Sequence, residues 1–425
     1  MTARNAAAPA AALSDPDTSG RAAPAWTIAT WLAWPLRRLL ARLLRDLACG
    51  SIEVALPDGQ RLAGRAAAPG PHAAITLLRW RTLWRLAVGG DIGLAESYRD
   101  GDWTTPDLTA LLEFGIRNES GWGDTLDAAG PARWLSRAIH ALRANTRVGS
   151  RRNIAYHYDL GNDFYCRWLD PQLIYSSAIY RDPTQSLEQA QADKLERVAA
   201  LLELDALPAD GTVLEIGCGW GALALQLARR HPARLVGLTL SAEQLRHAQR
   251  RVADEGAADR VDLRLQDYRD VRGEFDRIVS IEMLEAVGER YWPIYFETLR
   301  DRLRPGGRAV IQVITIADAH FEKYRRGADF IQRFIFPGGM LPSPTAMQAA
   351  AARAGLTMRT DERFGAGYAA TLVEWRRRFV AAWPHIAALG FDESFRRLWE
   401  YSLCYCEAGF RSERVAVGLY TLARA

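Results

Sequence analysis

An E-x-G-x-G-x-G stretch at residues 215–221 combines residue types and a spacing that could bind a reactive cofactor. A short apolar run at residues 213–216 is typical of a buried parallel strand, and a helical segment opens at Ala222. Gly217 and Gly219 let the backbone turn sharply and let a ligand lie directly on it. The turn also directs the free N–H groups of the next helix at that ligand. The stretch therefore predicts a nucleotide-type site at the carboxyl end of a parallel sheet, with the carboxylate of Glu215 beside it.

A second group of polar and aromatic residues lies at 153–180, just before this strand. His157, Asp159, Asn162 and Asp163 could line a site. Aromatic packing with local turn hydrogen bonds would produce the same composition, so both interpretations stay open here.

Further strands are needed to position these groups. Apolar stretches at 235–241, 263–267 and 275–281 alternate with helical segments, which predicts a doubly wound, Rossmann-like α/β sheet. The first of these strands ends in hydroxyl residues, and Asp267 places a carboxylate at the tip of the second. The acidic residue on the strand and the glycine spacing resemble motif I of the class I S-adenosylmethionine (SAM) methyltransferases. A Rossmann-like domain with a different ligand is the alternative.

Composition narrows the class of protein. The net charge of +4 gives no strong indication of nucleic-acid binding. Five cysteines without C-x-x-C spacing argue against a disulfide framework and favour a reduced, cytoplasmic protein. The sequence has no run of about 20 apolar residues and no secretory leader pattern, so we expect neither a membrane-spanning helix nor secretion.

The chain divides into four parts. Residues 1–25 are rich in Ala, Pro, Ser and Asp and predict a disordered tail. Residues 26–118 predict a small α+β domain, with a hairpin that turns at residues 57–59 and a closing helix at 105–118. Residues 119–150 form a connector, and 151–425 form the catalytic domain. The basic amphipathic helix at 26–48 fits a membrane-surface anchor and a helix docked on the folded body equally well.

An ordered series of motifs identifies a family. Residues 153–180, 211–221 and 266–270, together with Ile335-Phe-Pro-Gly-Gly-Met-Leu-Pro342 and Phe364-Gly-Ala-Gly-Tyr368, resemble the cyclopropane-fatty-acyl-phospholipid synthases, which include the mycolic acid cyclopropane synthases. The resemblance is strong over 151–425 and weaker in the small domain. It implies methyl transfer from SAM to the cis double bond of a phospholipid acyl chain, through a carbocation. It also implies a cytoplasmic enzyme peripheral to the inner membrane, and a homodimer stays open.

The resemblance also assigns roles to residues. It implies that the methionine end of SAM binds at Tyr175, Ser176, Gly217 and Gly219. The ribose and adenine would lie near Thr239, Leu240 and Gln244. Asp267, Tyr268 and Ile281 would lie at the adenine end. Without the family, Leu240 and Ile281 would be read as core residues.

The same resemblance implies a bicarbonate ion as proton acceptor, held in a box to which Glu285, Tyr368 and Ile314 correspond. Two positions depart from the family. Ser177 replaces the usual cysteine, and Gln312 replaces the usual histidine. Serine and glutamine still donate hydrogen bonds to an anion, but neither supplies a positive charge. Bicarbonate binding is therefore in doubt, and a methyl-branched, methylene or furan product is the alternative to ring closure.

The C-terminal part is rich in aromatic residues. Trp375, Trp383, Trp399 and Tyr401 are expected to wall an acyl tunnel, although such stripes also occur in ordinary cores. Residues 321–326 and 330–336 mix aromatic and basic side chains, which fits a surface that meets a bilayer and fits at least as well a helix that covers the sheet with a solvated basic face. Two further functions stay open: methylation of a soluble small molecule, and a lipid-binding protein without catalysis.

Overall fold

The computed structural model describes residues 28–123, 145–147, 149–150, 153 and 160–424, and the side chains from residue 34 onward. The predicted tail at 1–25 and the candidates His157 and Asp159 lie outside the described residues, as does most of the predicted connector at 119–150.

The large sheet has seven strands in the order β10-β11-β9-β8-β5-β6-β7. Five of them run parallel, and β11 is inserted antiparallel between β9 and β10. The strands are β5 (Thr212–Ile216), β6 (Arg234–Thr239), β7 (Val261–Leu265), β8 (Phe275–Ile281), β9 (Leu303–Ile316), β10 (Leu356–Arg363) and β11 (Val415–Arg424). The predicted doubly wound α/β sheet is confirmed, with each of the four predicted strands within two residues of its expected place.

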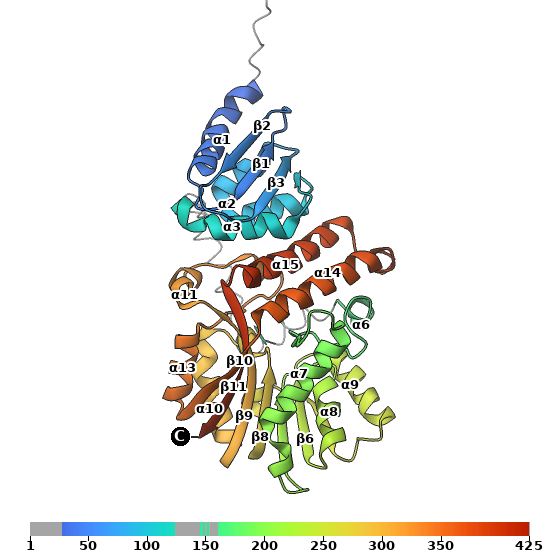
Figure 1. The fold of residues 1–425 in the computed structure, drawn as a ribbon. Helices are drawn as coiled ribbons and strands as arrows, with labels where there is room; N and C mark the ends of the chain where they lie inside the picture. The colour runs from blue at the N-terminus through green and yellow to red at the C-terminus, as the bar shows by residue number, and fades with distance from the viewer. Residues whose placement is uncertain (1–27, 124–144, 148, 151–152, 154–159, 425) are drawn as a thin grey trace, which may run out of the picture.

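Helices cover both faces of this sheet because its strands are apolar on both sides. Val213 packs in a cluster with one layer of helices, whereas its neighbour Leu214 packs in a second cluster with the other layer. The first layer is α7 (Leu187–Leu202), α8 (Ala222–Arg230) and α9 (Ala242–Asp254), and the second is α10 (Trp292–Arg302) and α13 (Pro344–Arg353). In Figure 1 the two layers lie on opposite sides of the strands.

The small domain, residues 28–123, has its own four-stranded sheet in the order β2-β1-β3-β4. Its elements are α1 (Ile28–Arg45), β1 (Ser51–Ala55), β2 (Arg61–Arg65), β3 (His72–Leu77), α2 (Arg81–Arg99), β4 (Trp103–Thr104) and α3 (Leu108–Trp122). The predicted hairpin is confirmed, with Gly59 at φ 85° in its turn. The closing helix begins three residues later than predicted, because the Asp107 side chain accepts the backbone N–H of Ala110 and caps it there.

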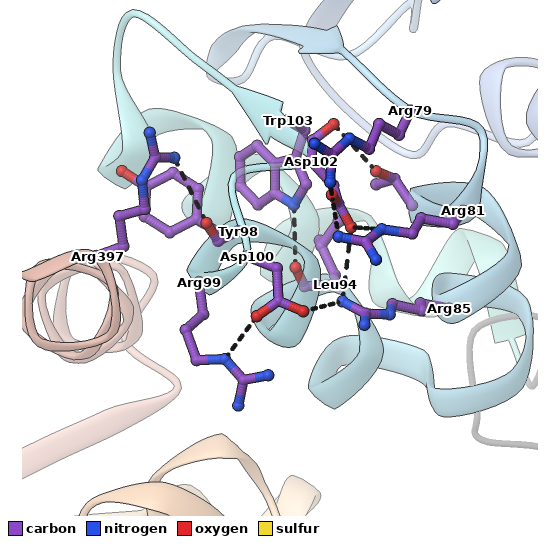
Figure 2. Close-up of polar contacts among 11 residues, drawn as sticks. Arg79, Arg81, Arg85, Leu94, Tyr98, Arg99, Asp100, Asp102, Trp103 and Arg397 are labelled. Atoms are coloured by element: carbon purple, nitrogen blue, oxygen red, sulfur yellow. Dashed lines mark hydrogen bonds and ion pairs between the residues drawn. The ribbon is translucent and has the colours of Figure 1, made fainter. Parts of the chain in front are cut away.

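An aspartate fixes the corner of the small domain between α2 and β4 (Figure 2). The side chain of Asp102 is fully buried and pairs with Arg79, Arg81 and Arg85. The indole N–H of the next residue, Trp103, donates to the carbonyl of Leu94 at 3.0 Å. Three arginines around one buried carboxylate leave this corner basic, because two of them keep about half of their side chains exposed.

Two long antiparallel helices join the domains. In Figure 1, α14 (Gly365–Ala387) and α15 (Glu393–Arg411) lie between the small domain and the end of the large sheet. Glu407 of α15, whose role the sequence did not reveal, is buried there. It accepts a hydrogen bond from Thr109 of α3 at 2.9 Å and pairs with Arg376 and Arg411 at 3.4 and 2.6 Å. This buried carboxylate therefore links the small domain to both long helices.

The described chain also has three short α-helices, α6 (Asn162–Tyr165), α11 (Asp318–Tyr324) and α12 (Phe330–Phe334), and four single-turn 3-10 helices. None of the helices in the described part of the chain is long and apolar enough to cross a membrane.

Candidate active site

The glycine turn joins β5 to α8 at the carboxyl end of the parallel strands. Gly217, Gly219 and Gly221 have φ values of 87°, 53° and 85°, which side-chain-bearing residues rarely adopt. A Cβ atom on Gly219 would meet no protein atom within 4 Å. Gly221 begins α8 without a side-chain cap, so the N-terminal end of this nine-residue helix lies at the turn, and Glu215 interacts with the backbone N–H of Ala224 in its first turn. This geometry fits a cofactor that lies against the backbone.

A cavity of about 940 Å³ opens at this turn. Most of the residues assigned to SAM line it: Tyr175, Ser176, Glu215, Gly217, Gly219, Thr239, Leu240, Gln244, Tyr268 and Ile281. The predicted box residues Glu285, Ile314 and Tyr368 line it too. Ser177, Gln312 and Asp267 do not reach its wall. The carboxylate of Asp267 accepts hydrogen bonds from the guanidinium of Arg269 at 2.6 and 2.8 Å. Asp267 therefore positions the loop that carries Tyr268.

Glu215 provides the acidic group of the cofactor region. Its side chain is 3% exposed, and its Oε2 atom has no hydrogen-bond partner among the described residues. Burial raises the pKa of Glu215 to about 8, and the nearby ammonium of Lys194 counters that effect. A buried carboxyl with one unpartnered oxygen on the cavity wall suits a cationic ligand such as SAM, whose positive charge would lower the pKa of Glu215 and favour its carboxylate form.

Glu282 is the centre of the reactive end of the cavity. Its Oε1 accepts the backbone N–H of Ser177 at 2.8 Å and the side-chain amide of Gln312 at 2.7 Å. Its Oε2 accepts the hydroxyl of Tyr368 at 2.7 Å. These three donors are the ones that the sequence assigned to a bicarbonate ion. The side chain of Glu282 holds them instead, so the described residues do not fit an added bicarbonate.

The backbone of Glu282 supports a functional role. Its φ of 49° lies in the left-handed region, which costs a non-glycine residue roughly 1–2 kcal/mol. Burial raises the pKa of Glu282, while its three hydrogen bonds favour the carboxylate form. Burial also raises the pKa of Tyr368 well above its ordinary value, which keeps this phenol protonated as a donor. The cluster therefore holds a hydrogen-bonded carboxylate at the cavity wall.

Glu285, which the sequence placed in the box, has a different environment. One oxygen accepts the backbone N–H of Ile314, and the other has no partner among the described residues. Burial raises the pKa of Glu285 to about 8, and the carboxylate of Glu282 adds to this effect. Glu285 is therefore mostly protonated at neutral pH and is the weaker candidate for a proton acceptor.

Lys194 is a second residue that the sequence did not single out. It is 1% exposed, and its ammonium donates to the hydroxyl of Ser176 at 2.8 Å. Burial lowers the pKa of Lys194 to about 8, while Glu282, Asp170 and Glu215 oppose that shift. No spacing marked Lys194, which lies on α7. Glu282 carried a signal, because it directly follows strand β8, where the ligands of parallel sheets bind.

The burial of Glu285 predicts how stability depends on pH. Folding raises its pKa from 4.5 to about 8, so between these values the folded state binds more protons than the unfolded state. The free energy of unfolding should therefore fall as pH rises through this window, by up to about 1.4 kcal/mol per pH unit for this group. Urea unfolding at about pH 5.5 and about pH 7.5 measures the slope. Glu285→Gln should lose less stability than the wild type across the same interval, and equal slopes would contradict the prediction.

Comparison with known proteins agrees with this geometry. The family model described as mycolic acid cyclopropane synthetase matches residues 145–419. Tuberculostearic acid methyltransferase UfaA1 of Mycobacterium tuberculosis is 40% identical over 356 residues, which cover 80% of each chain. Cyclopropane-fatty-acyl-phospholipid synthase of Escherichia coli K12 is 37% identical, over 80% of this chain and 85% of that protein. The crystal structure of mycolic acid cyclopropane synthase CmaA1, complexed with SAH and CTAB, matches with a TM-score of 0.59 and 30% identity, over 64% of this chain and 97% of that chain. The chain therefore belongs to the mycolic acid cyclopropane synthetase family and is a SAM-dependent methyltransferase.

Proposed function

We propose that this enzyme methylates the double bond of an unsaturated acyl chain in a membrane phospholipid. The observation that carries the proposal is the shape of the cavity. From the glycine turn it runs past Glu282 and Tyr368 into a region walled by Leu372, Trp375 and other apolar side chains. An olefin inside a chain reaches a reactive centre only through such an apolar channel, whereas a small polar acceptor would need polar partners along it.

The residues at the reactive end suit attack by an alkene. Bound SAM supplies an electrophilic methyl group on a sulfonium centre. The π electrons of the olefin would form the new carbon–carbon bond while the methyl–sulfur bond breaks and its electron pair stays on sulfur as S-adenosylhomocysteine leaves. A cation then remains on the neighbouring carbon. Tyr175 and Trp375 lie with ring centroids 5.2 Å apart, and Tyr368 and Trp375 with centroids 6.1 Å apart. Their faces stabilise a cation without forming a covalent bond to it, and the apolar wall excludes water from it.

Glu282 is the proton acceptor that this mechanism requires. A C–H bond of the transferred methyl group breaks, its electron pair closes the ring or forms a double bond, and the proton passes to the Glu282 carboxylate. The donors from Ser177, Gln312 and Tyr368 fix this carboxylate, and they stabilise its charged form before the transfer. Two of the three methyl hydrogens then remain in the product, whether it is a cyclopropane or a methylene chain.

Labelled methionine tests both the function and this step. A host that makes unsaturated phospholipids and expresses the enzyme is grown with methyl-deuterated methionine, and its fatty acids are analysed by mass spectrometry. We expect one added carbon with two deuterium atoms. Three retained deuterium atoms would exclude proton loss from the methyl group, and unchanged unsaturated chains would contradict the function. The relatives named above include a cyclopropane synthase and a tuberculostearic acid methyltransferase, so fragmentation that separates a ring from a branch is part of the measurement.

The basic corner of the small domain supports peripheral attachment at the cytoplasmic face of a membrane. Leu78 and Trp84 are 54% and 62% exposed, and Arg79 and Arg81 lie between them in the chain. Apolar tips beside arginines match an anionic bilayer surface. Flotation with vesicles that contain phosphatidylglycerol is expected to carry the wild type, and to carry Trp84→Ala less. Equal flotation of both proteins would show that Trp84 does not contribute to membrane binding.

A further inference from the structure

The cavity does not end in the catalytic domain. Beyond Trp375 it passes α15 at Tyr401 and enters the interior of the small domain. There it is lined by apolar side chains from α1, both central strands and the two domain helices, among them Leu43, Val54, Ile75, Leu86 and Leu111. We call this part the small-domain arm and the part beside the active site the catalytic arm. The total volume of about 940 Å³ is near the upper end of the roughly 300–1,000 Å³ that single small-molecule sites occupy.

A band of charged residues lines the cavity at the domain junction, where Tyr401 and other apolar side chains also line it. Asp91 and Glu119 reach the cavity from the small domain, and Lys323, Arg326, Asp329 and Arg414 reach it from the catalytic domain. Glu119 connects the two sides, since it pairs with Lys323 at 2.9 Å and also with Arg414. Lys323 and Arg326 keep 47% and 71% of their side chains exposed, so the cationic side of this band meets solvent.

A break in helix α2 places two of its residues on the cavity wall near this band. Gly90 interrupts the helix with φ 60° and ψ −139°, a conformation open to glycine but not to other residues. The next two residues, Asp91 and Ile92, line the cavity on the far side of this break.

We propose that the small-domain arm binds the second acyl chain of a diacyl phospholipid whose first chain lies in the catalytic arm. This proposal rests on the proposed function and names the form of its substrate. Both arms are lined by apolar side chains and charged side chains gather at their junction, which matches a lipid whose two chains are joined near a phosphate. The phosphate then lies at the band, within reach of Lys323, Arg326 and Arg414.

The alternative occupant is the far end of the reacting chain itself. The methylenes of that chain would then lie beside the charged residues of the band. Methylenes beside these charged groups would separate them from their partners or from water, and the lost hydrogen bonds would destabilise that arrangement. A phosphate ester at the same place instead offers oxygens to the cations. The charges at the junction therefore favour two chains on either side of a head group over one chain that passes through.

Gly115 offers a way to fill the small-domain arm selectively. It lies on α3 and lines the cavity, and a Cβ atom there would meet nothing within 4 Å. Gly115→Phe should place a ring in the arm, and phenylalanine has a higher helix propensity than glycine, so the substitution does not oppose the helix. Ser120→Phe on the same helix is the matched control, because Ser120 is exposed and does not line the cavity.

The test compares a two-chain with a one-chain substrate. Methyl transfer is measured on dioleoyl phosphatidylglycerol and on oleoyl lysophosphatidylglycerol, each in detergent micelles. For Gly115→Phe we expect the ratio of kcat/KM between the two-chain and the one-chain lipid to fall by about tenfold, which corresponds to about 1.4 kcal/mol. Ser120→Phe should keep the wild-type ratio. An equal loss on both lipids, or no loss on either, would overturn the proposal.

A second readout does not depend on catalysis. Native mass spectrometry of each protein after incubation with dioleoyl phosphatidylglycerol should show retained lipid for the wild type and for Ser120→Phe, and less for Gly115→Phe. Retention that is equal in all three proteins would also contradict the second-chain site. If the wild type methylated neither lipid yet retained the two-chain lipid, the proposed function would fail while the binding site stood.

Discussion

Glu282→Gln is expected to lower kcat by about 100-fold or more, with SAM affinity nearly unchanged, because general-base contributions are typically of that size. Glutamine keeps the length of the side chain but cannot take a proton from the transferred methyl group. The residue lies at the wall of the cavity and accepts three hydrogen bonds, so the substitution acts at the reacting atoms. Single-turnover methyl transfer measures the effect, with SAM binding by calorimetry beside it.

Two further variants separate a chemical from a structural role. Glu285→Gln is expected to lose much less activity, because Glu285 already holds a proton near neutral pH. Glu282→Gly removes the carboxylate, relieves the φ of 49° and frees the N–H of Ser177, the amide of Gln312 and the hydroxyl of Tyr368. Added bicarbonate should then restore part of its activity. Near-normal activity of Glu282→Gln would rule out Glu282 as the proton acceptor.

Gly219→Leu is expected to weaken SAM binding by at least about 100-fold, which corresponds to about 2.7 kcal/mol. The new side chain would extend from the glycine turn into the open space where the cofactor lies, since no protein atom occupies it. Isothermal titration with SAM measures the affinity directly. Catalysis should fall in proportion at a fixed SAM concentration and recover in part when that concentration is raised.

The backbone cost of this change needs its own control. Gly219 has φ 53°, so any side chain there costs roughly 1–2 kcal/mol of stability as well. Gly256→Leu carries the same penalty, because Gly256 has φ 65° and also meets no atom within 4 Å, yet it does not line the cavity. Both variants should lose similar stability in urea, and Gly219→Leu alone should lose SAM affinity. Equal affinity in the two would place the cofactor elsewhere.

Local sequence patterns were sufficient for much of the protein. The apolar run before Gly217 predicted β5, because a strand covered on both faces needs apolar residues on both. The glycines at alternate positions predicted the cofactor turn, because only they adopt positive φ without strain. These properties belong to a few adjacent residues, and folding leaves them unchanged.

Local sequence patterns could not decide whether Glu282 or Glu285 is the proton acceptor. Both residues follow β8 within four positions, and the family resemblance selected Glu285. Which carboxylate meets Ser177, Gln312 and Tyr368 depends on how three distant segments converge, and hydrogen bonds across 30 to 105 residues leave no local pattern. Lys194 escaped notice for the same reason, since its burial beside Ser176 results from packing of α7 on the sheet.

The sheet, the cofactor turn and the family could be predicted from the sequence, because each depends on neighbouring residues or on an ordered series of motifs. The folded chain was needed to show which carboxylate accepts three hydrogen bonds and that the cavity extends past the domain junction into the small domain. Long-range contacts set the burial and the partners of ionisable groups, and these in turn set their pKa values. The chemistry of the site therefore depends on the fold more than on the residues taken alone.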